Sequence, residues 1–86
     1  MASLRTLAQK ACVDVPGIEV VKLNILLSGT VHEAVIDYKG HNRVVTFLYE
    51  DLQAYSEEWL LDDVIAQFEK FKTDVDKAIA ENSSIQ

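Results

Sequence analysis

The sequence predicts a single α+β domain with the element order α-β-β-β-α, in which a three-stranded antiparallel meander carries a long C-terminal helix on one face. Residues 56–80 place apolar side chains at alternating steps of three and four, which is the spacing of one helix face. Residues 18–49 read as three β-rich runs separated by turn-forming segments. With 86 residues the chain has room for one domain, spanning 1–86, and we expect residues 82–86 to form a frayed tail.

The first expected helix begins after Ser3, which is a suitable N-cap residue. It ends at Val15-Pro16-Gly17, because proline disfavours the helical conformation of the residue before it and glycine permits a sharp turn. The apolar stripe of this helix comprises Leu4, Leu7, Ala8, Ala11 and Cys12.

Three strands are expected at Ile18–Leu27, Thr30–Tyr38 and Arg43–Tyr49, with two-residue turns at Ser28-Gly29 and Gly40-His41. These turns set the register of both strand pairs, and the register gives one coherent apolar face. That face comprises Val21, Leu23, Ile25, Leu27, His32, Ala34, Ile36, Tyr38, Val45, Phe47 and Tyr49. In detail, the turns place Val21 opposite Ile36, Ile36 opposite Val45 and Ala34 opposite Phe47.

The second face of the meander mixes charged residues with valine and leucine. A fully solvated face of an antiparallel sheet usually shows cleaner alternation. We therefore expect partial cover on this face, either from the first helix or from another chain. Its residues are Val20, Lys22, Asn24, Leu26, Val31, Glu33, Val35, Asp37, Val44, Thr46 and Leu48.

The long helix is expected to begin after the N-cap Ser56 and to be about 37 Å long at 1.5 Å per residue. A compact chain of this size has a diameter of roughly 30 Å, so the helix either overhangs the sheet or ends near Thr73 and folds back. An overhanging apolar stripe favours a homodimer, formed through this stripe, through the second sheet face, or through both. The stripe comprises Phe71, Val75, Ala78 and Ile79.

The net charge is −6, and residues 44–69 contain no lysine or arginine. This interval carries an acidic series: Glu50, Asp51, Glu57, Glu58, Asp62 and Asp63. The series is either a solvated acidic face or a binding surface, which would dock a basic partner or mimic the charge of nucleic-acid phosphates. Aromatic residues lie close to this series in sequence. Among them, Trp59 is interpreted equally well as an interface anchor and as a core residue.

No catalytic residue, cofactor site or metal site is indicated. The three glycines are explained by turns, and the sequence has neither a cysteine pair nor an HExxH motif. His32, His41 and Cys12 have no motif that assembles a nucleophile with a base, so we interpret them as structural. The single cysteine favours a reducing compartment, which we take to be the cytoplasm, and no apolar run reaches the ~20 residues of a membrane span.

The element order resembles that of double-stranded RNA-binding domains, which grip phosphates with a basic start of their second helix. Here the corresponding helix begins with Glu57-Glu58, followed by Asp62-Asp63, so RNA binding is not implied. The sequence predicts a small acidic, non-enzymatic protein-interaction module, an accessory or inhibitory factor that forms a homodimer. The alternatives are a nucleic-acid-binding module and a small enzyme with an unrecognised site.

Overall fold

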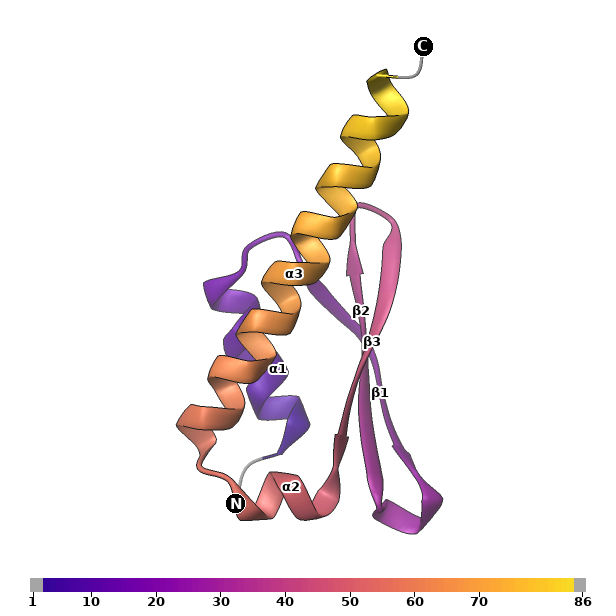
Figure 1. Ribbon diagram of the computed structural model, residues 1–86. Coiled ribbons are helices and arrows are strands. Elements are labelled where there is room, and N and C mark those ends of the chain that lie inside the picture. The colour runs from indigo at the N-terminus through magenta and orange to yellow at the C-terminus, as the bar shows by residue number, and fades with distance from the viewer. Residues whose placement is uncertain (1–2, 85–86) are drawn as a thin grey trace.

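The computed structural model describes residues 3–84 and confirms the predicted α-β-β-β-α order (Figure 1). A short helix, α2, connects the third strand to the long helix. The elements are α1 (Leu4–Asp14), β1 (Glu19–Leu26), the 3-10 turn η1 (Leu27–Gly29), β2 (Val31–Tyr38), β3 (His41–Leu48), α2 (Tyr49–Ala54) and α3 (Glu57–Ser84).

The fold has two layers, and both long helices lie on the same face of the β1-β2-β3 sheet (Figure 1). The prediction that α1 could cover the second face is therefore wrong. Four residues of the apolar stripe of α1, Leu4, Leu7, Ala8 and Ala11, are buried between α3 and the sheet, and Cys12 is partly buried. The small side chains of Ala8 and Ala11 allow the two helices to approach closely. No helix of the described residues lies over the second face of the sheet, which is called the outer face below.

One hydrophobic core fills the space between the layers. Phe68 and Leu60 on α3, Leu7 on α1 and Ile36 on β2 are each fully buried. Burying one such side chain contributes about 1.5–3 kcal/mol to the free energy of unfolding, so the core residues together hold α3 against the sheet. Ser3 caps α1 as predicted, because its side chain accepts a hydrogen bond from the Thr6 amide.

The register between β1 and β2 is confirmed near the turn and wrong at its far end. Leu23 pairs with Ala34 as predicted, but Ile36 pairs with Val20 rather than Val21. A β-bulge at Val21 adds one residue to β1, and Val21 is consequently 60% exposed. The turn itself is also longer than predicted, because β1 ends at Leu26 and β2 begins at Val31. Within this turn, Leu27 and Ser28 of η1 have positive φ angles.

The register between β2 and β3 differs from the prediction by two residues. The turn is Lys39-Gly40, and both residues have positive φ, which is the signature of a type I′ hairpin. Ala34 therefore pairs with Val45 instead of Phe47. Because side chains alternate with a period of two, this shift leaves every residue of β3 on the predicted face.

Helix α3 is continuous from Glu57 to Ser84, so the alternative of a helix that ends near Thr73 is wrong. Its last turns extend past the rest of the molecule (Figure 1), which measures 48 × 25 × 15 Å. The helix also passes the expected end at Ala80, because no glycine or proline stops it there. Residues 85–86 of the predicted tail lie outside the described residues.

The β2–β3 hairpin is tied to the middle of α3 by polar contacts. Asp76 accepts hydrogen bonds from the Tyr38 hydroxyl and the Lys39 ammonium, each at 2.8 Å. Asp74 accepts one from the Arg43 guanidinium at 3.1 Å. The hydrogen bond from Lys39 and, to a smaller extent, the one from Tyr38 lower the pKa of Asp76. The hydrogen bond from Arg43 lowers the pKa of Asp74.

The packing of the hairpin on α3 divides the four residues of the predicted dimer stripe into two buried and two exposed residues. Phe71 is buried beneath the hairpin, with the Arg43 guanidinium 5.0 Å from its ring centroid, and Val75 is also buried. Both side chains are therefore packed within their own chain. Ala78 and Ile79 remain exposed on the part of α3 that follows.

Candidate interaction surface

The acidic series lies on α2 and the first two turns of α3. Glu57 forms an ion pair with Lys10 of α1, and the hydrogen bond in that pair lowers the Glu57 pKa. Within residues 3–84, none of the other five carboxylates forms an ion pair. These five carboxylates belong to Glu50, Asp51, Glu58, Asp62 and Asp63.

The junction between α2 and α3 directs two neighbouring side chains to opposite environments. Ser56 caps α3 as predicted, accepting a hydrogen bond from the Trp59 amide at 3.1 Å. The helix that starts there buries Leu60 completely and leaves Trp59 53% exposed. The Trp59 ring stacks on Tyr55, with centroids 4.5 Å apart, so the structure places this tryptophan on the surface.

A groove of about 330 Å³ runs between β3 and α3 and is closed at one end by α2. We call it the β3–α3 groove. It brings part of the acidic series together with the aromatic pair. Its lining comprises Thr46, Phe47 and Leu48 of β3, Asp51 of α2, Tyr55, and Trp59, Leu60, Asp63 and Gln67 of α3.

The two carboxylates in the β3–α3 groove differ in their surroundings. Asp63 accepts a hydrogen bond of 3.0 Å from the Gln67 amide, which fixes its orientation on the helix surface. The Asp51 carboxylate has no hydrogen-bond or ion-pair partner among the described residues. The groove therefore holds two negative charges without a neutralising cation beside two exposed aromatic rings.

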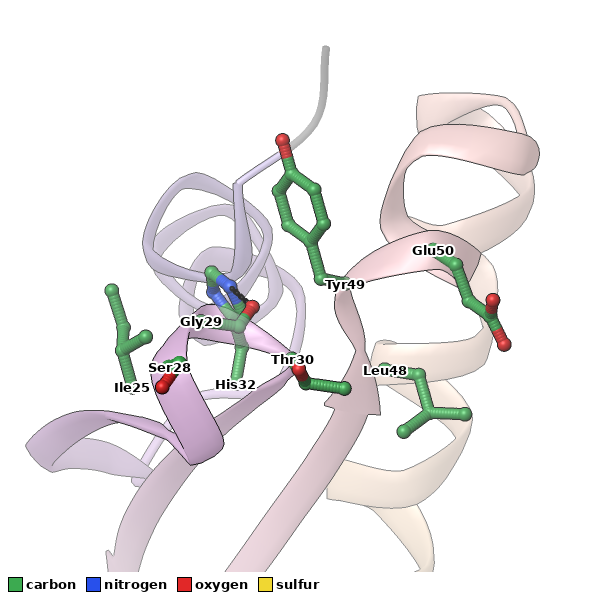
Figure 2. Close-up of a pocket in the computed structure, with 8 residues that line it drawn as sticks. All are labelled: Ile25, Ser28, Gly29, Thr30, His32, Leu48, Tyr49 and Glu50. Carbon is green, nitrogen blue, oxygen red and sulfur yellow. Dashed lines mark hydrogen bonds between the residues drawn. The ribbon is translucent and has the colours of Figure 1, made fainter.

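A second hollow, of about 600 Å³, opens at the end of the sheet where η1 meets the start of α2 (Figure 2). The His32 ring stacks on Tyr49 with centroids 5.6 Å apart, and its Nε2 lies 3.2 Å from the Gly29 carbonyl oxygen. Figure 2 shows the Glu50 carboxylate pointing away from the His32 ring. His32 is thus held by η1 and Tyr49 rather than by a carboxylate.

The outer face of the sheet carries alternating apolar and polar rows. Leu26, Val31 and Leu48 pair across the three strands, and Val35 pairs with Val44 further along. Leu26, Val44 and Leu48 are each more than 40% exposed. Between these rows, Asn24 donates a hydrogen bond to Glu33 at 2.9 Å. The apolar rows of this face are exposed, and no helix among residues 3–84 covers them.

Residues with the chemistry for catalysis or metal binding are dispersed. Burial, and then the nearby Glu19 carboxylate, raises the pKa of the Cys12 thiol, which favours its neutral, less nucleophilic form. Over residues 3–84 no group of three His, Cys, Asp or Glu side chains is arranged to hold a metal ion. In the same range no helix has the length and apolar character to cross a membrane.

No protein-family model, curated protein or solved structure matches the chain.

Sequence reasoning identified the acidic residues and the aromatic residues Tyr55 and Trp59 of the β3–α3 groove but missed Thr46 and Gln67. Thr46 and Gln67 line the groove, and neither belongs to a pattern that singles it out. Asp51 and Asp63 are distinguished from the other acidic residues only by the direction that α2 and α3 give them. The one available signal was the short segment between the third strand and the long helix, which folds as α2 and closes the groove.

Proposed function

We propose that the chain is a small non-enzymatic interaction module, an accessory or inhibitory factor, that binds a basic segment of a partner protein in the β3–α3 groove. The observation that carries this proposal is the meeting of two unneutralised carboxylates, Asp51 and Asp63, with the stacked rings of Tyr55 and Trp59. Lysine and arginine side chains are the groups that such a site recognises.

Charge supports the basic partner. The chain carries a net charge of −6, which attracts cationic surfaces over a Debye length of about 8 Å at physiological salt. Such fields mainly raise the association rate. A phosphate backbone would be repelled by the same carboxylates, so the proposal favours a protein partner over a nucleic acid.

The aromatic pair supports a specific contact. An arginine or lysine placed over the face of an exposed tryptophan gains about 0.5–1 kcal/mol, and more where water is excluded. The Tyr55 and Trp59 rings already stack on each other, so little side-chain freedom remains to be lost on binding. Exposed tryptophan and tyrosine are also the residues most enriched among the energetically dominant positions of interfaces.

A selection from displayed random peptides tests this function. The library should contain peptides as long as β3, eight residues, and the full chain should be the bait. We expect the retained peptides to be enriched in arginine and lysine. A Trp59→Ala variant used as the bait should no longer retain them. Retention of peptides without a basic bias, or retention of none, would contradict the proposed function.

We also propose that the chain is cytoplasmic and forms a homodimer. Support for the dimer comes from the uncovered apolar rows of the outer face and from exposed Ile79 on the projecting end of α3. An 86-residue chain buries a small core, and association would add buried apolar area. Val35, in the middle of the outer face, lies where a second copy would make contact.

A further inference from the structure

Strand β3 is an edge of the sheet, and half of its backbone groups face outward. In a type I′ hairpin the residues that flank the turn, Tyr38 and His41, exchange two hydrogen bonds, and bonded pairs then recur at every second residue. The Tyr49 amide donates to the Thr30 carbonyl at 2.8 Å, which confirms that odd-numbered residues face β2. The N–H and C=O groups of Val44 and Thr46 therefore point to the open edge.

No other element pairs with this edge. Among residues 3–84, no backbone hydrogen bond from a helix or turn reaches the outward groups of Val44 and Thr46. β3 also pairs with β2 over its whole length without a bulge. Such a regular, unpaired edge is a template for another extended chain.

The opposite edge of the sheet differs in this respect. β1 contains the bulge at Val21, which disrupts regular pairing and twists the strand. It also carries Glu19 and Lys22, and charged residues and bulges are the devices that protect edges from further pairing. Of the two edges, β3 is the one suited to accept a strand.

The β3–α3 groove lies directly along this open edge. A strand added beside β3 would direct alternate side chains toward the helix layer, where α3 presents Trp59, Asp63 and Gln67 and α2 presents Asp51. A basic side chain on that face of the added strand would lie between the aromatic pair and the two carboxylates. The remaining side chains would extend the outer face next to Val44 and Leu48.

The geometry points to β-strand addition: an extended segment of a partner protein pairs with β3 as a fourth strand and inserts an arginine or lysine into the β3–α3 groove. This inference rests on the proposed function and names the conformation and backbone pairing of the bound segment. A second copy of this chain fits the edge less well. Its β3 would offer Arg43 as the only lysine or arginine, and that residue is already bound to Asp74.

Backbone N-methylation of one of the selected eight-residue peptides tests strand addition. Each variant carries one N-methyl group, which removes an amide donor and blocks close approach, and its affinity is measured by titration calorimetry. In a strand only alternate residues bond to the neighbouring chain. We expect methylation at every second position to weaken binding about tenfold or more, and methylation at the positions between to be tolerated.

A matched pair of protein variants provides the second readout. Thr46→Pro removes an outward N–H without removing a hydrogen bond to β2, whereas Thr46→Ala keeps that N–H. Both variants lose the threonine side chain that lines the groove, and only Thr46→Pro also loses the N–H. We therefore expect Thr46→Pro to weaken peptide binding about tenfold more than Thr46→Ala does.

The outcomes separate the inference from the proposed function. A selected basic peptide whose affinity shows no alternation on N-methylation would overturn strand addition and leave the proposed function standing. A protein that binds no basic peptide would overturn both. A dimer that Thr46→Pro converts to monomer, with peptide binding unchanged, would assign the edge to a second copy and also overturn the inference.

Discussion

At the residue scale, Leu60 and Trp59 show how one helix start divides core from surface. The two residues are adjacent in the chain, yet Leu60 is fully buried and Trp59 is 53% exposed. Sequence spacing gave Trp59 two equal interpretations, as an interface anchor and as a core residue. The Ser56 cap fixes where α3 begins and thereby sets the direction of both side chains. The stacking of Trp59 on Tyr55 depends on the path of α2, which no periodicity in the sequence revealed.

This division predicts different consequences for two alanine substitutions. Leu60→Ala should lower the free energy of unfolding by about 2–5 kcal/mol, because it leaves a cavity in a packed core. Trp59→Ala should change it by less than about 1 kcal/mol, because much of the ring faces solvent. Urea denaturation followed by far-UV circular dichroism measures both. A Trp59→Ala variant as unstable as Leu60→Ala would place Trp59 in the core.

At the element scale, the β2–β3 hairpin shows which errors of register are harmless. The turn was expected at Gly40-His41 and lies at Lys39-Gly40, because a type I′ turn takes two residues of positive φ and Gly40 occupies the second position. The even shift kept Val45 and Phe47 in the core. The bulge at Val21 had the opposite effect, since one extra residue reverses the faces of β1 beyond it. Only packing against the helices reveals that bulge.

The hairpin contacts with α3 predict a pH-dependent stability. Asp74 and Asp76 have lowered pKa values in the folded chain, so the unfolded chain binds more protons as the pH falls through this range. The stability they contribute is present above the unfolded pKa of about 3.9 and is lost as the pH falls through the folded values. The thermal unfolding midpoint should therefore decrease below about pH 4.

Substitution identifies the carboxylate responsible. Asp76 is faced by Tyr38, Lys39 and Lys72, and Asp76→Asn removes its charge from these contacts. This variant should have a lower midpoint at neutral pH and a shallower decrease on acidification. Asp62→Asn is the matched control, since Asp62 is exposed and forms no ion pair within residues 3–84. Equal acid sensitivity of Asp76→Asn and the unmodified chain would contradict the assignment.

At the scale of the whole molecule, comparing the expected helix length with the expected domain diameter was more informative than the pattern of apolar side chains. A helix of about 37 Å on a domain of roughly 30 Å was expected either to project or to end near Thr73, and α3 projects beyond the sheet (Figure 1). The pattern of apolar residues, however, could not separate Phe71 and Val75, which the hairpin covers, from Ile79, which it does not. That distinction depends on where the hairpin ends.

The proposed homodimer is tested by multi-angle light scattering. The unmodified chain should have the mass of two 9.7 kDa chains at micromolar concentration. Val35→Lys places a charge in the middle of the outer face and should yield a folded monomer, because burying an unpaired charge in an interface is costly. Val13→Lys, which changes an exposed valine on α1 away from the outer face, is the control and should remain dimeric. A monomeric unmodified chain would contradict the dimer.

In the proposed function, the position of the carboxylates, and not the total charge, determines binding. Asp51→Asn with Asp63→Asn removes two negative charges from the β3–α3 groove, and Glu58→Gln with Asp62→Asn removes two from the neighbouring acidic surface. The most direct measurement is the affinity of a selected basic peptide for both double variants at physiological salt. We predict a loss of about tenfold, or 1.4 kcal/mol, for the groove variant and less than about twofold for the control. Equal losses in the two variants would contradict the claim.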